Sequence, residues 1–368
     1  MESSPSGGID ILRGAVMVLM AIDHVRVYAG VPAGGPTMGV FLTRWVTHFC
    51  APVFAFLAGT SIFLRAERSS GRGALTRRLF TRGAWFVFLE LTFLRLAWTF
   101  NFDYEHYTLG GVIWMLGWCM ILMGLLIHLP VKANAAIGLG MIAGQDLLAA
   151  AFSGVDHPLW RILYTGGSIG SFAILYSLIP WIGVMSAGYA FGAVLRLPGE
   201  RRHRVCLSIG LAACAAFLAS QVLFLVLRPD PRTPAWIQLL SARKYPASLS
   251  FLLMTLGPAI ALLPLLERAH GRLADWLGVF GRAPMFYYLL HIPLIHIVAV
   301  GISCVRTPQA TNWLTGNFPL RPAPVPEGYM WSLGLLYLVT AAVVVALYFP
   351  CRWYTKRKAP VFSTAPTP

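Results

Sequence analysis

Ten apolar stretches, each close to the length that crosses a bilayer, constrain this chain more than any other feature. A helix needs about 20 apolar residues to span the hydrocarbon core. Only 12% of the 368 residues are charged, and the mean hydropathy is +0.67. We therefore expect an all-α, polytopic membrane protein, with residues 1–368 forming a single domain of about ten transmembrane helices. The stretches are residues 9–30, 40–64, 79–100, 111–129, 134–152, 171–195, 205–227, 247–266, 280–302 and 331–350.

Positive charge is distributed unevenly between the connecting segments. If the chain crosses at every stretch, most of its 29 Lys and Arg residues fall on the side that also holds both termini. The positive-inside rule makes that side cytoplasmic. We expect residues 352–368 to form a basic cytoplasmic tail, partly disordered. One observation opposes this topology, because residues 228–244 carry several cations on the side assigned to the exterior.

The net charge of +15 and the six cysteines exclude several classes of function. The cations lie in short loops between apolar segments, so we assign them to topology and to anionic lipid headgroups, and expect no nucleic-acid partner. The cysteines form no CxxC pair, which argues against a disulfide framework or a zinc site. The first apolar stretch has no basic n-region and no cleavage site, so we interpret it as a retained helix.

The first apolar stretch carries ionisable residues at both ends. Arg13 and His24 are eleven steps apart, and eleven steps of about 100° return both side chains to one helix face, roughly 16 Å apart. Charged groups inside a membrane are costly, so by default they indicate function. A snorkelling arginine and an interfacial histidine are the structural alternative.

Arginine, ten residues, then histidine on a first membrane helix resembles the signature of the acyltransferase-3 membrane enzymes. The run IDILRGAVMVLMAIDHVR also resembles the opening of an uncharacterised bacterial membrane family related to heparan-alpha-glucosaminide N-acetyltransferase. That second likeness continues through residues 47–64, 179–192 and 280–296. It implies ten or eleven helices, acetyl-CoA as donor and an amino sugar as acceptor.

The sequence departs from this second family at one place. The proposed catalytic histidine of the family follows the first helix, whereas residues 31–47 contain no histidine here. Only His24, or less directly His48, is available for that role. The two resemblances thus nominate different positions.

The expected topology sorts the intramembrane polar residues into two layers. In the inner layer, Arg13 and Arg282 would bind the phosphates of acetyl-CoA. In the outer layer, His24 would be the catalytic base, with Asp23 beside it in sequence. The residues expected to bind the acceptor are His48, Arg44, Glu90, His291 and His296.

Each acceptor-binding assignment has a structural alternative. Glu90 would also serve as the counter-ion of an arginine, and Arg44 as an interfacial anchor. His48 would equally make a hydrogen bond between packed helices. His291 and His296 are five residues apart and face different directions on an ideal helix, so we expect no metal pair there.

These features predict an acyl-CoA-dependent O- or N-acyltransferase of a bacterial cytoplasmic membrane. It would move an acyl group, most simply acetyl, to a hydroxyl or amine of a saccharide or glycolipid on the outer face. His24 would accept the proton of the acceptor, or in a variant carry the acetyl group covalently. A homodimer is compatible with the sequence. The alternative from another class is a transporter or flippase of a glycolipid or small anion.

Overall fold

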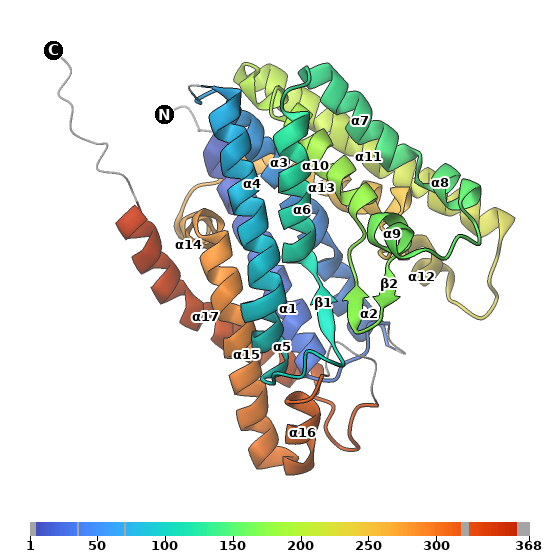
Figure 1. The fold of residues 1–368 in the computed structure, drawn as a ribbon, viewed down its shortest axis with the longest axis vertical. Coiled ribbons are helices and arrows are strands. Elements are labelled where there is room, and N and C mark those ends of the chain that lie inside the picture. The colour runs from blue at the N-terminus through green and yellow to red at the C-terminus, as the bar shows by residue number, and fades with distance from the viewer. Residues whose placement is uncertain (1–4, 35–36, 70, 318–323, 359–368) are drawn as a thin grey trace. The chain divides into compact units, whose positions relative to one another are not determined.

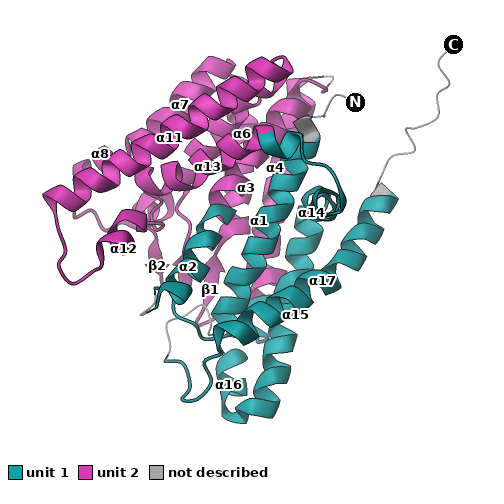
Figure 2. Ribbon diagram, turned by 180° about the vertical axis from the view of Figure 1, so that it is seen from behind, with its two compact units in different colours: residues 1–50, 96–102, 265–368 teal, residues 51–95, 103–264 magenta. Residues whose placement is uncertain are grey.

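The computed structural model describes residues 5–34, 37–69, 71–317 and 324–358, and almost all of its regular structure is helical (Figure 1). The described chain divides into two compact units (Figure 2). Unit 1 comprises residues 1–50, 96–102 and 265–368, and unit 2 comprises residues 51–95 and 103–264. The predicted dominance of helix is confirmed, and one small sheet adds to it.

Close backbone approach between α1 and α14 organises unit 1. A Cβ atom added to Gly281 would lie 1.8 Å from the carbonyl oxygen of Asp10, and one added to Gly14 would lie 1.9 Å from that of Leu277. Small residues permit this kind of helix contact in membranes. The helices of unit 1 are α1 (Pro5–Tyr28), α2 (Met38–Val46), η1 (Thr47–Phe49), α14 (Arg272–Arg282), α15 (Pro284–Arg306), η5 (Pro308–Ala310), α16 (Thr311–Leu314) and α17 (Leu333–Lys358).

In unit 2, two helices also approach each other closely at glycine residues. A Cβ atom at Gly59 would lie 1.9 Å from the carbonyl oxygen of Met185, and one at Gly188 would lie 2.1 Å from that of Phe56, so α3 and α10 touch through their backbones. Its helices are α3 (Cys50–Ala66), α4 (Arg72–Leu89), η2 (Glu90–Leu94), α5 (Arg95–Thr99), α6 (Val112–Leu126), α7 (Val131–Ala143), α8 (Gln145–Ala151), α9 (Pro158–Trp160), η3 (Arg161–Thr165), α10 (Leu178–Phe191), η4 (Val194–Arg196), α11 (Gly199–Leu227), α12 (Ala235–Leu240) and α13 (Leu249–Glu267). Three of these elements include residues of unit 1: α3 begins with Cys50, α5 has only Arg95 in unit 2, and α13 ends in unit 1 from Leu265 onward.

A three-stranded sheet in unit 2 corrects one expected helix. The strands are β1 (Thr108–Gly110), β2 (Gly167–Ile169) and β3 (Phe172–Ile174), in the order β1-β3-β2. Strand β3 runs parallel to β1 and antiparallel to β2. The apolar stretch expected to be helical over residues 171–195 therefore begins as strand, and its helix, α10, starts only at Leu178. A second expected helix, 134–152, is interrupted at Gly144 between α7 and α8.

Among the described residues, six helical segments are long and apolar enough to cross a membrane by length and composition. They are Met38–Ala66, Leu178–Arg196, Gly199–Leu227, Leu249–Glu267, Pro284–Arg306 and Leu333–Arg357, and the apolar helices α6 and α7 are shorter. Two further expected stretches are also helical: α1 covers the first, and the uninterrupted run from α4 through η2 to α5 covers the third. Residues 352–358 of the expected tail continue α17, and residues 359–368 lie outside the described part of the chain.

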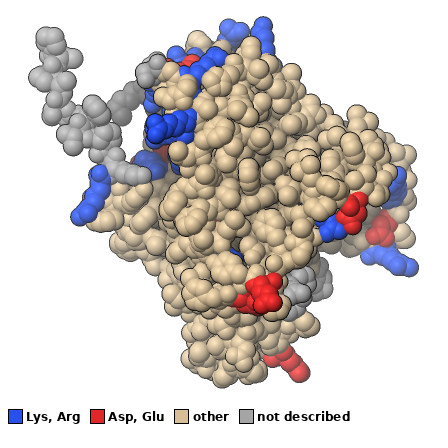
Figure 3. Space-filling model, viewed as in Figure 1, with Lys and Arg blue, Asp and Glu red and all other residues tan. Residues whose placement is uncertain are grey.

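Helix α11 presents a surface suited to hydrocarbon. Only 17% of its most apolar window is buried, and Leu211, Leu218, Val226 and Leu227 are each more than half exposed. Figure 3 shows one face of the molecule, on which uncharged side chains predominate. In water, an apolar surface of this extent promotes aggregation, whereas in a bilayer it faces lipid tails.

Candidate functional site

The structure joins two of the predicted site histidines, His24 on α1 and His291 on α15, both in unit 1. His24 Nδ1 and His291 Nε2 are 2.6 Å apart. The two ring centroids are 4.8 Å apart, with 22° between the ring planes. His291 is fully buried and His24 is half-buried. A short hydrogen bond therefore links a buried imidazole to a partly exposed one.

The hydrogen-bond network assigns the tautomer of both rings. His291 Nδ1 lies 2.7 Å from the backbone carbonyl oxygen of Tyr288 and 3.2 Å from that of Tyr287. A carbonyl oxygen only accepts, so in the neutral ring Nδ1 of His291 carries the hydrogen and Nε2 carries the lone pair. His24 then donates from Nδ1 to that lone pair. The lone pair of a neutral His24 ring consequently lies on Nε2.

Aromatic rings fix the position of the His24 imidazole. Trp98 meets it edge-on at 4.8 Å between ring centroids, and Tyr288 meets it at 6.2 Å, again nearly perpendicular. Tyr28 stacks on Trp98 and donates a hydrogen bond of 2.9 Å to the Trp98 carbonyl. These contacts hold the ring by edge-to-face packing and surround it with apolar groups.

Asp23 and Arg44 form an ion pair that ties α1 to α2. Arg44 Nη1 lies 2.9 Å from both carboxylate oxygens of Asp23 and also donates to Thr47 Oγ1 at 3.1 Å. Arg26 donates to Asp23 at 3.1 Å and to the carbonyl of Val31 at 2.8 Å. The Asp23 carboxylate, which was predicted to act beside His24, is therefore paired with two guanidinium groups. The side chain that orients the His24 ring is His291.

The two predicted donor-binding arginines differ in their accessibility. Arg13 donates to the carbonyl of Gly281 at 3.0 Å and to Asp10 at 3.2 Å, and its side chain is 17% exposed. Arg282, one residue beyond Gly281, is exposed and interacts electrostatically with Asp10. Because Arg13 contacts α14 while His24 contacts α15, both side chains face the α14–α15 segment. Since α1 is one continuous helix from Pro5 to Tyr28, eleven steps of about 100° keep the two side chains on one face of it.

His296 and His48 occupy different surroundings in unit 1. His296 is fully buried, and its two ring nitrogens each lie 3.0 Å from a backbone carbonyl oxygen, that of Ala97 and that of Leu314. Phe100 stacks on it at 3.7 Å. The hydrogen bonds and the ring contact of His296 therefore join α15 to residues 96–102 and to α16. His48 is half-buried in η1, which packs against α1.

Glu90, in unit 2, caps a helix. Its Oε2 accepts hydrogen bonds from the backbone N–H groups of Ile113 at 2.9 Å and Trp114 at 3.1 Å, in the first turn of α6. The side chain is only 2% exposed. A carboxylate at a helix N-terminus satisfies amides that have no partner within the helix and complements the helix dipole.

Removing this cap is expected to destabilise the protein. We expect Glu90→Ala to lower the free energy of unfolding by about 1–3 kcal/mol, because two buried amides lose their acceptor. Glu90→Gln keeps a carbonyl oxygen at the same place and should lose less. Thermal unfolding of both variants in detergent measures the difference. An alanine variant as stable as the original protein, with a changed KM for acceptor, would instead assign Glu90 to substrate binding.

The apolar helices and their lipid-compatible surface define a multi-pass membrane protein. The chain belongs to the family of heparan-alpha-glucosaminide N-acetyltransferase, since the model described as "Heparan-alpha-glucosaminide N-acetyltransferase, catalytic" matches residues 6–231. The family resemblance is confirmed. A comparison with curated proteins finds no match. The matched region contains His24 and ends before His291.

Sequence reasoning found the members of this site but missed how they pair. The i, i+3 spacing of Asp10 with Arg13 and of Asp23 with Arg26 was available as a signal for both ion pairs. No sequence signal pairs His24 with His291, because 267 positions separate them. Within the described residues, no group of three or more His, Cys, Asp or Glu side chains is placed to hold a metal ion.

Proposed function

We propose that this chain transfers an acyl group, acetyl in the simplest case, from cytoplasmic acyl-CoA to a saccharide or glycolipid on the outer face of a bacterial cytoplasmic membrane. The observation that carries the proposal is the His24–His291 pair, because it presents a half-buried imidazole with its lone pair on Nε2. Membership of the N-acetyltransferase family supplies the reaction class.

In the proposed reaction, an acceptor hydroxyl or amine attacks the thioester carbonyl carbon. The new C–O or C–N bond forms as the C–S bond breaks, and Nε2 of His24 takes the acceptor proton. The CoA thiolate leaves and receives that proton. His291 keeps Nδ1 of His24 as a donor throughout, so the imidazolium that forms is stabilised by the same hydrogen bond.

Ten crossings are part of this proposal. One helical segment is available for each expected crossing. These segments are the six long apolar ones, the shorter α6 and α7, the charged helix α1, and the helix running from α4 to α5. An even number of crossings places both termini on one side of the membrane, and the excess of Lys and Arg on that side makes it cytoplasmic.

Purified full-length protein incubated with [14C]acetyl-CoA and a panel of amino sugars, neutral sugars and glycolipids tests the proposal. We expect release of free CoA that depends on an acceptor, with label recovered in a sugar. Protein in sealed vesicles that moves a labelled glycolipid or anion across the bilayer, and leaves acetyl-CoA intact with every acceptor, would favour the transporter alternative and contradict acyl transfer.

A further inference from the structure

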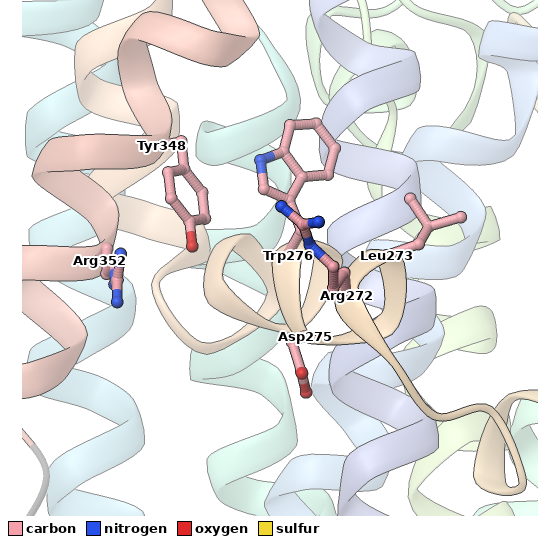
Figure 4. A pocket seen from close by; sticks show the side chains of 6 residues that line it. All are labelled: Arg272, Leu273, Asp275, Trp276, Tyr348 and Arg352. Atoms are coloured by element: carbon pink, nitrogen blue, oxygen red, sulfur yellow. The ribbon is translucent and has the colours of Figure 1, made fainter.

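A pocket of about 800 Å³ opens between α14 and α17 in unit 1. Figure 4 shows its lining, with the Trp276 and Tyr348 rings beside each other and two arginine side chains near them. The lining residues are Arg272, Leu273, Asp275, Trp276, Tyr348 and Arg352. The pocket lies outside residues 6–231 that the family model matches.

The chemistry of this pocket suits an aromatic base that carries phosphates. The rings of Trp276 and Tyr348 are 6.1 Å apart at 24°, which offers a planar ligand aromatic faces and edges. Arg272 and Arg352 are exposed, and within the described part of the chain neither guanidinium forms an ion pair with a carboxylate. Arg272 also begins α14, an 11-residue helix whose N-terminal dipole favours an anion.

A continuous row of ring contacts connects the pocket to His24. Trp276 touches Phe280 at 4.9 Å, Phe280 touches Tyr287 at 5.2 Å, and Tyr287 touches His291 at 5.3 Å between centroids. The last step, from His291 to His24, is 4.8 Å. The pocket thus lies within roughly 20 Å of the proposed base along this path. A ligand that used both places would need a long arm between its anionic end and its reactive end.

We propose that this pocket binds the adenosine phosphate end of the acyl-CoA donor, an inference that rests on the proposed function. Acyl-CoA has the required form, because a phosphorylated adenosine at one end is joined by the extended pantetheine arm to the thioester at the other. The adenine lies against Trp276 and Tyr348, and the phosphates bind Arg272 and Arg352 as charge-assisted hydrogen-bond acceptors.

An anionic lipid headgroup offers the same phosphate chemistry without the base, so the experiment must separate the two ligands. The test variant is Arg272→Ala/Arg352→Ala. Its matched control is Lys356→Ala/Arg357→Ala, which removes the same charge from the exposed end of α17 without touching the pocket lining. Each protein is purified at full length in detergent and in nanodiscs of neutral or anionic lipid.

Three measurements are made on each protein. They are the Kd of adenosine 3′,5′-bisphosphate by calorimetry, the KM for acetyl-CoA, and the KM for acetyl-pantetheine, which has no nucleotide. We expect the test variant to weaken nucleotide binding and raise the KM for acetyl-CoA by about 10-fold or more, with kcat and the acetyl-pantetheine kinetics unchanged. The control should match the original protein.

The outcomes separate this inference from the proposed function. If the test variant loses nucleotide binding and the control keeps it, the pocket is supported as the nucleotide site. This holds even if no acetyl group is transferred to any acceptor. Unchanged nucleotide binding and unchanged KM for acetyl-CoA would overturn the inference while acyl transfer stood. A nucleotide Kd that the test variant retains in detergent and in neutral nanodiscs, and that anionic nanodiscs weaken only in the original protein, would also overturn it and would assign the pocket to a headgroup.

Discussion

Replacing His24 with alanine should lower kcat for acetyl transfer by about 10²–10⁴-fold, the range that a positioned general base contributes. The reason is geometric, since Nε2 of His24 is the nitrogen that the network leaves without a hydrogen of its own when the ring is neutral. Steady-state transfer of [14C]acetyl to the best acceptor of the panel measures the loss. The Kd of CoA should stay within about twofold, because the proposed role of the imidazole is to take the acceptor proton and not to bind the nucleotide end of the donor.

His106→Ala is the matched control for this substitution. His106 lies in an exposed loop of unit 2, where its ring pairs with Asp103 at 2.7 Å and is 63% exposed. We expect this variant to retain full turnover. Turnover of His24→Ala equal to that of the original protein, with the variant folded by size-exclusion chromatography, would remove His24 from the mechanism.

Adding a single methyl group at Gly281 should destabilise unit 1 severely. The new Cβ atom would lie 1.8 Å from the carbonyl oxygen of Asp10, and a backbone oxygen yields only if α1 and α14 move apart. We expect Gly281→Ala to lower the free energy of unfolding by about 3 kcal/mol or more, at the upper end of the cost of overpacking. Separation of these helices also breaks the hydrogen bond from Arg13 to Gly281.

Gly301→Ala supplies the opposite expectation within the same unit. Gly301 lies in α15, is exposed, and has no atom within 4 Å of an added Cβ, so alanine there should be neutral or stabilise by up to about 1 kcal/mol. Unfolding of both variants by heat or denaturant in detergent gives the comparison. Equal stability of Gly281→Ala and Gly301→Ala would show that the α1–α14 contact is looser than described.

Helix positions were predictable because apolar length is a local property of the sequence. The error over residues 171–177 has the same origin, since a short apolar run is equally compatible with a buried strand and with a helix. The partner that decides in favour of strand is β1, which lies more than sixty positions earlier. The break at Gly144 was visible only as a glycine inside an apolar run, a signal that many continuous helices also contain.

The site was predictable to the extent that it depends on a single helix. Arg13 and His24 share a face of α1 because helical periodicity alone determines it. The hydrogen bond to His291 and the capping role of Glu90 each depend on a tertiary contact, and neither contact leaves a periodic trace in the sequence. Asp23 was expected beside His24 from adjacency in sequence, which on a helix separates side chains by about 100°.

The most direct test of His24 as the base is to observe which of its ring nitrogens carries the hydrogen. Nitrogen NMR of protein labelled with 15N-histidine, recorded at mildly alkaline pH and assigned with His24→Ala, reports this tautomer. We predict that Nδ1 of His24 is protonated and Nε2 is not, and that His291→Leu abolishes this preference. A His24 ring protonated at Nε2 in the original protein, with the same signal in His291→Leu, would contradict the proposed base.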